Sequence, residues 1–229
     1  MKQGPIQIEP VSISCGKITL DGDLSVPYNA SGIVLFAHGS GSSRYSHRNR
    51  YVANILNYNG LATLLFDLLT HEEEEEDRWT AHLRFDIPLL ADRLVYATDW
   101  IKNHGDILNL KIGYFGASTG AAAALVAAAR RPNLVQAIVS RGGRPDLAGR
   151  ELGRVIAPTL LIVGEKDEVV INLNNEAFQE LKHVRDKRII IVPNATHLFE
   201  EPGTLKEVAK AATNWFLTYL KDQRQTKYE

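Results

Sequence analysis

The chain has 229 residues, of which 45% are hydrophobic and 23% are charged, and its formal net charge is -1. These values are typical of one globular domain, so we expect residues 1–229 to form a single domain. A net charge this small gives no general attraction to nucleic acid or to an anionic membrane, and neither is an expected partner. No stretch approaches the roughly 18 apolar residues of a membrane span.

Two further features concern the compartment. The residues at the start lack the uninterrupted apolar segment of a secretory signal, which favours a cytoplasmic protein. Cys15 is the only cysteine, so the chain cannot form an intramolecular disulfide or a thiolate metal cluster, and a buried structural role is expected for it.

Alternating apolar and polar residues over 6–14 and 17–26 predict an antiparallel hairpin, with a turn or bulge around Gly22. After it the pattern changes to continuous apolar runs, which predict parallel strands buried on both faces. These runs cover 32–37, 62–66, 111–115, 135–139, 159–163 and 188–192.

Helical patterns lie between these runs. Apolar residues recur at three- and four-residue steps over 85–104, and Thr204 with Glu207 forms a capping-box pair that predicts the start of a final helix. The alternation predicts an α/β fold with about eight mostly parallel strands in one sheet and helices on both faces. The acidic segment 71–77 is expected to be an exposed loop, with a flap beside the active site as the alternative.

The pentapeptide 116–120 matches G-x-S-x-G between a predicted strand and an alanine-rich predicted helix. In such a tight turn the glycines allow a sharp bend, and the serine is held in a strained, exposed position. A chain of this length contains the pentapeptide by chance about one time in ten, so its context carries the argument. That context makes Ser118 a candidate nucleophile.

A serine nucleophile needs a base, and the base needs an orienting acid. In the chain order Ser, Asp, His, the candidates are Asp167 and His197, each after a predicted strand. Alternatives are Glu165 or Asp146 as the acid and His183 as the base, although His183 lies near a predicted helix end. The oxyanion of the intermediate needs two amide donors. We assign them to Thr119 and to Ser40 in a glycine-rich loop, with Gly41 as the alternative to Ser40.

Over nearly its whole length the chain resembles the α/β-hydrolase superfamily, and within it the small, lidless dienelactone-hydrolase-like members. The resemblance rests on the dipeptide His38-Gly39, the Ser118 turn, the Asp167 loop and the late histidine, in the family's order. It implies nucleophile, acid and base roles for Ser118, Asp167 and His197, and oxyanion donors at Ser40 and Thr119. Dienelactone hydrolases proper have a cysteine where this chain has Ser118.

The expected reaction is hydrolysis of a small-molecule carboxylic ester with a small or exposed acyl group, through an acyl-enzyme, without a metal or an organic cofactor. The span between 139 and 159 is too short for an inserted cap. Arg141 and Arg144 are candidates for binding a substrate carboxylate, with solvated or salt-bridged surface arginines as the alternative. The same alternatives apply to arginines 44, 48 and 50.

Competing functions remain open at this stage. A thioesterase, a lactonase or a peptidase would use the same triad, and a non-catalytic binding protein could share the fold. A dinucleotide site in the loop after 33–37 is disfavoured, because Arg44 stands where the third glycine of that motif belongs. The oligomeric state is not predicted.

Overall fold

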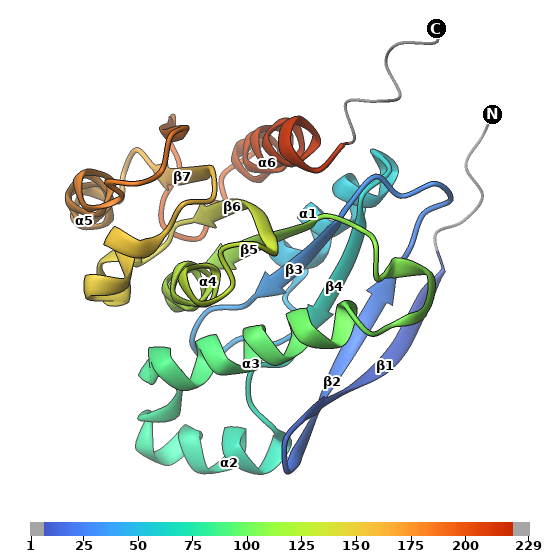
Figure 1. Ribbon diagram of the computed structural model, residues 1–229. Helices are drawn as coiled ribbons and strands as arrows, with labels where there is room; N and C mark the ends of the chain where they lie inside the picture. Colours follow the sequence, from blue (N-terminus) through green and yellow to red (C-terminus); the bar gives the residue numbers. More distant parts are fainter. Residues whose placement is uncertain (1–6, 222–229) are drawn as a thin grey trace, which may run out of the picture.

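A computed structural model describes residues 7–221 and shows an eight-stranded sheet with helices on both faces (Figure 1). The order of strands is β1-β2-β4-β3-β5-β6-β7-β8, and all neighbours from β4 to β8 are parallel. The predicted α/β-hydrolase architecture is therefore confirmed. The strands are β1 (Ile8–Cys15), β2 (Ile18–Ser25), β3 (Ile33–Ala37), β4 (Ala62–Phe66), β5 (Ile112–Ala117), β6 (Val135–Arg141), β7 (Thr159–Gly164) and β8 (Lys187–Val192).

Six α-helices and three 3-10 segments connect the strands in the described part of the chain, and the longest of these segments, η3, is kinked at Gly149. They are α1 (His47–Tyr58), α2 (His71–Thr80), η1 (Leu83–Phe85), α3 (Ile87–Ile101), η2 (Gly105–Ile107), α4 (Thr119–Arg130), η3 (Pro145–Arg154), α5 (Glu168–Glu180) and α6 (Thr204–Leu220). η3 fills most of the interval between β6 and β7, so no separate cap is inserted there.

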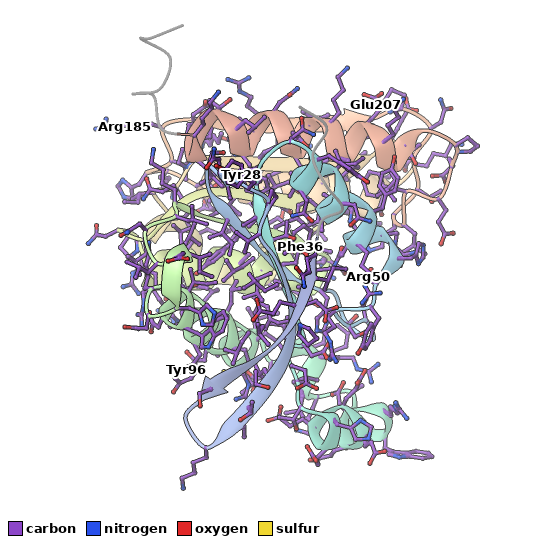
Figure 2. The ribbon with its side chains drawn as sticks, turned by 90° about the vertical axis from the view of Figure 1, so that its right-hand side faces the viewer. Tyr28, Phe36, Arg50, Tyr96, Arg185 and Glu207 are labelled. Atoms are coloured by element: carbon purple, nitrogen blue, oxygen red, sulfur yellow. The ribbon has the colours of Figure 1, made fainter. Side chains whose placement is uncertain are left out.

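The sheet separates two hydrophobic clusters. Helices α3, α4 and α5 supply apolar residues to one cluster, and α1 and α6 supply them to the other, as the layers in Figure 1 indicate. Phe36 of β3 lies inside the molecule in Figure 2, with its ring centroid 4.9 Å from that of Phe115, whereas Glu207 lies on the outer side of α6. The apolar runs that form β3 to β7 are therefore strands covered on both sides, as expected.

Two expectations about the sheet are wrong. β2 pairs with β1 without a break at Gly22, which stands opposite Val11, and a Cβ there would lie 3.1–3.3 Å from the side chains of Val11, Leu64 and Phe66. β8 is not covered on both faces: it is an edge strand, and Ile190 and Ile191 are 37% and 40% exposed. Ile6, where we expected the first strand to begin, lies outside the described residues.

The acidic segment forms helix α2 rather than an exposed loop. Thr70 and Glu73 form a capping box, with the Glu73 amide donating to Thr70 Oγ1 and the Thr70 amide donating to Glu73 Oε2. Carboxylates in the first turn also interact favourably with the positive end of the helix dipole. These interactions outweigh the like-charge repulsion along the segment. The spacing of Thr70 and Glu73 is typical of a capping box, and the sequence analysis overlooked it.

The predicted capping box of α6 is also wrong. Gly203, in the left-handed conformation at φ 86°, precedes the helix, and the Thr204 hydroxyl donates to the carbonyl of Glu201 instead of capping Glu207. The helix itself is present and packs on the sheet beside α1. Over residues 7–221, we find no helix with the length and apolar character that a bilayer span requires.

Candidate active site

Ser118 occupies a strained turn between β5 and α4. Its backbone lies at φ 50° and ψ -122°, outside the regions that residues with a side chain normally adopt. The turn is fixed by backbone hydrogen bonds: the Ser118 amide donates to the Arg141 carbonyl, and the Ser118 carbonyl accepts from Ala121 and Arg144. The backbone thus holds the serine, and its side chain makes no cap bond to α4.

The glycines around this turn are required because neighbouring backbone segments approach them too closely for a side chain. A Cβ atom on Gly116 would lie 2.4 Å from the Cα of Ala121, and one on Gly120 would lie 2.2 Å from the carbonyl oxygen of Ala37. A Cβ atom on Gly39, in the loop after β3, would lie 3.0 Å from the Cβ of Ser118. The motif residues therefore let the strand, the helix and the loop meet around one side chain.

His197 and Asp167 are in contact. The Nδ1–H of His197 donates to Oδ2 of Asp167 at 2.6 Å, and the Asp167 side chain is 15% exposed. Asp167 stands immediately before α5, but its carboxylate makes no cap bond to that helix. With Nδ1 facing the carboxylate, Nε2 is the ring nitrogen left free to act as a base.

Backbone contacts bring these two loops together. The amide of Lys166 donates to the Ala195 carbonyl at 2.9 Å, and a Cβ on Gly164 would lie 2.5 Å from that same carbonyl oxygen. The loop after β7 and the loop after β8 therefore pack backbone against backbone. This packing places an acid from one loop beside a histidine from the other.

The alternative acids and base have other surroundings. Glu165 accepts from the backbone amide of Asn194 at 2.7 Å. Asp146 pairs with Arg144, and His183 is exposed after the end of α5. Among these candidates, Asp167 is the one that the structure places against His197.

The loop after β3 is held by His38. Leu68 donates its backbone amide to Nε2 of His38 at 3.0 Å, so Nδ1 carries the proton and faces the Gly39 carbonyl at 3.0 Å. Burial lowers the pKa of His38, while the Gly39 contact and the carboxylates of Asp67 and Glu74 partly oppose this shift. A neutral histidine thus links the loop that carries Ser40 to the segment after β4.

Two cavities flank this loop. A cavity of about 250 Å³ contains Ser118 and His197 in its wall, together with Ser40, Arg48 and Arg141. A second cavity of about 390 Å³ lies under α2, with Thr119 in its wall and Leu68 and Leu90 among its apolar residues. Both cavities include Gly39, Ser40 and Ser42, and both predicted oxyanion donors therefore border a cavity.

The two candidate carboxylate-binding arginines are separated by the structure. Arg141 is 6% exposed and lies in the wall of the Ser118 cavity, where its Nη2 donates to Oδ1 of Asn49 at 3.1 Å. Arg144 makes two hydrogen bonds to Asp146, at 2.9 and 2.7 Å, and is not among the residues that line that cavity.

Two further residues of the site, Asn49 and the anchoring His38, were not predicted in these roles, whereas Arg48 was among the candidate arginines. Arg48 also lines the Ser118 cavity and donates to Glu200 at 3.1 Å. Arg48 and Asn49 lie in the first turn of α1, behind Ser46, which caps that helix. Serines before α1 are typical of a helix start, but they do not indicate which cavity the first turn of that helix borders.

Comparison with known proteins identifies relatives of this chain. The model described as "Dienelactone hydrolase family" matches residues 20–221. The crystal structure of a dienelactone hydrolase from Anabaena variabilis is 61% identical, covers 94% of this chain and 99% of that one, and superposes with a TM-score of 0.91. Est1E from Butyrivibrio proteoclasticus, at 16% identity, covers 91% of this chain and 98% of its own, and its TM-score of 0.74 shows a shared fold.

A Mycobacterium tuberculosis protein, provisionally named a phosphoribosyl transferase, is 56% identical over 216 residues. The match covers 94% of this chain and 47% of that protein, so the chain spans about half the length of this relative. The name therefore describes a chain about twice as long.

Proposed function

We propose that this chain, which belongs to the dienelactone hydrolase family, is a hydrolase that cleaves carboxylic esters with Ser118 as the nucleophile. The observation that carries this proposal is the arrangement of the Ser118 cavity. A strained serine and a histidine whose Nδ1 faces a carboxylate lie in the wall of the same 250 Å³ cavity.

In the proposed reaction, Nε2 of His197 takes the proton of the Ser118 hydroxyl as the serine oxygen attacks the ester carbonyl. Asp167 stabilises the resulting imidazolium. The amide of Thr119 is the first of α4, so it has no acceptor within its own helix and can bind the oxyanion together with the amide of Ser40.

His197 then returns the proton to the departing alkoxide, and an alcohol and an acyl-enzyme result. Water attacks the acyl carbon and gives one proton to the same histidine, which passes it to the Ser118 oxygen as the bond between that oxygen and the acyl carbon breaks and the carboxylic acid leaves. Every proton moves between Ser118, His197, substrate and water, so the residues of the chain suffice for each step. A thioester or a lactone would follow the same steps with a thiol or a tethered alcohol as the leaving group.

Labelling with a fluorophosphonate tests the proposal. We expect one covalent adduct, located at Ser118 by peptide mapping, and turnover of para-nitrophenyl acetate and butyrate. Ser118→Ala should abolish the label, and both Ser118→Ala and His197→Ala should lower kcat by roughly four orders of magnitude. A folded wild-type protein that neither takes the label nor hydrolyses these esters would contradict the proposal.

A further inference from the structure

The proposed catalytic steps leave the cavity under α2, here called the α2 cavity, without a role. Its volume is about 390 Å³, within the roughly 300–1,000 Å³ of sites that bind small molecules. Leu68, Leu69 and Leu90 form the apolar part of its wall, and side chains of α2 form another part. In Figure 1, α2 lies below α3 and projects from the body of the molecule. The structure thus provides a pocket next to the nucleophile that the catalytic residues do not fill.

The α2 cavity begins at the proposed oxyanion site. Ser40 and Thr119, whose amides are the proposed oxyanion donors, both lie in its wall, and Gly39, Ser40 and Ser42 border the Ser118 cavity as well. The carbonyl oxygen of a bound ester would lie at these two amides. The carbonyl carbon is one covalent bond away from that oxygen, so a group attached to this carbon can extend directly into the α2 cavity.

The position of His197 indicates which half of the ester enters the α2 cavity. The departing alkoxide takes its proton from Nε2 of His197, so the alcohol half has to lie on the side of this histidine. His197 is in the wall of the Ser118 cavity and is not among the residues that line the α2 cavity. The acyl half is attached on the other side of the reacting carbon, and it is therefore directed toward the α2 cavity.

The charges around the α2 cavity balance one another. Asp67 forms an ion pair with Arg44, and Asp77 accepts a hydrogen bond from Nε of Arg84 at 2.5 Å. The two other charged residues of the wall belong to α2 and have opposite signs. Because His38 is neutral, the wall formed by the described residues carries no net charge. A charged acyl group would lose its hydration here without gaining a counterion, so an uncharged group fits best.

We infer that the ester hydrolysed at Ser118 has an uncharged acyl chain longer than acetyl, and that this chain binds in the α2 cavity between the three leucines and α2. The inference rests on the proposed esterase function and names its substrate class. It makes Leu69 and Leu90 specificity-determining residues and makes α2 a wall of the acyl site. The acyl group expected from the sequence was small or exposed, because only the interval between β6 and β7 was considered as a cover.

A series of para-nitrophenyl esters tests the length and the charge of the acyl group. From acetate through butyrate to hexanoate, kcat/KM of the wild-type enzyme should rise about threefold for each added methylene, as expected when that group leaves water for an apolar site. The mono-esters of adipate, an anion, and of 6-(trimethylammonio)hexanoate, a cation, should react more slowly than hexanoate. Equal kcat/KM from acetate to hexanoate, or a charged ester that reacts faster, would overturn the inference while leaving the esterase function intact.

Substitutions in the wall test whether the α2 cavity holds the chain. Leu69→Phe narrows it and should lower the hexanoate-to-acetate ratio of kcat/KM about tenfold, whereas Leu90→Ala enlarges it and should move the highest kcat/KM to octanoate. Leu110→Phe is the matched control and should retain the wild-type ratio. Leu110, like Leu69, is partly buried against the first hydrophobic cluster, but it lines neither cavity. A folded Leu69→Phe enzyme with the wild-type ratio would contradict the inference.

A second series distinguishes the acyl half from the alcohol half. Ethyl acetate and hexyl acetate differ only in the alcohol, so Leu69→Phe should not change their ratio of kcat/KM. A loss confined to hexyl acetate would place the alcohol in the α2 cavity and overturn the assignment. Absence of fluorophosphonate labelling at Ser118 in the folded wild-type protein would instead remove the proposed function.

Discussion

Ser118 lies between the end of β5 and the start of α4, and its φ angle is positive. Backbone hydrogen bonds to residues 121, 141 and 144 hold it there. At this scale the sequence predicted the geometry of the turn, because the glycines at 116 and 120 have a steric reason that can be read from the motif. Asp167 and His197 could be predicted from their order after successive strands. The burial of Arg141 could not, since it depends on α1 and Phe199, which are far away in the chain.

The acid of the proposed triad gives the first residue-scale prediction. Asp167→Asn should lower kcat for para-nitrophenyl esters by about four orders of magnitude, because an amide cannot stabilise the imidazolium and favours the wrong tautomer of His197. Glu165→Gln is the matched control, since Glu165 contacts Asn194 and should retain wild-type kcat. Steady-state kinetics of the two folded variants decides the assignment, and a larger loss in Glu165→Gln would refute it.

His38 gives a prediction about pH. Its pKa is lowered in the folded protein by burial, so below the usual histidine pKa the unfolded chain binds more protons than the folded one. The free energy of unfolding should therefore fall as the pH decreases from about 7 to about 5. His38→Asn removes this titrating group, and urea unfolding should show a shallower pH dependence for it than for wild type. Equal slopes would show that His38 titrates normally.

Helix α2 is stable although its neighbouring carboxylates repel one another. Glu73 contributes twice, because Oε2 accepts from the Thr70 amide and Oε1 lies 2.5 Å from Nη2 of Arg93 on α3. The projection of α2 below α3 is visible in Figure 1. Sequence analysis weighed the repulsion among six carboxylates and overlooked the cap, and the ion pair with α3 has no local signal at all.

An element-scale prediction follows for the attachment of α2. Glu73→Ala removes the cap acceptor and leaves Arg93, which is 8% exposed, without its partner, so it should cost roughly 1–3 kcal/mol. Glu76→Ala, at an exposed position of the same helix, should change stability by less than about 0.5 kcal/mol. Urea unfolding gives both values, and amide hydrogen exchange in α2 shows whether the loss is local. Similar values for the two variants would contradict this role of Glu73.

For the whole molecule, the number of strands, their mostly parallel arrangement and the presence of helices on both faces of the sheet were the most predictable features. They follow from repeated alternation of apolar runs and helical patterns along the chain. The exposure of β8 was not predictable in this way, because nothing within its apolar run indicates that the run forms the edge of the sheet. An edge strand and a central strand can have the same local composition.

The second hydrophobic cluster gives a prediction at this scale. Phe216 of α6 is fully buried, and its ring packs directly on Gly113 of β5. A Cβ atom on Gly113 would lie 2.7 Å from Cε1 of this ring. Phe216→Ala should lower the free energy of unfolding by about 3–5 kcal/mol, because it leaves a cavity between helix and sheet. Tyr58→Ala, at a side chain that is 71% exposed, is the control and should have little effect. Chemical denaturation measures both, and a loss below about 1 kcal/mol for Phe216→Ala would mean that α6 is loosely packed.

The hydrogen bonds that fix the Ser118 turn involve the main chain of residues 141 and 144, whereas the cation at position 141 belongs to a side chain. The turn therefore depends on main-chain atoms of residue 141, and its side chain can be replaced without removing those hydrogen bonds. Position 141 is therefore a point at which substrate preference can evolve without rebuilding the turn. A library with all twenty amino acids at this position, screened against neutral, anionic and cationic esters, should contain variants with altered preference that still react with a fluorophosphonate at Ser118.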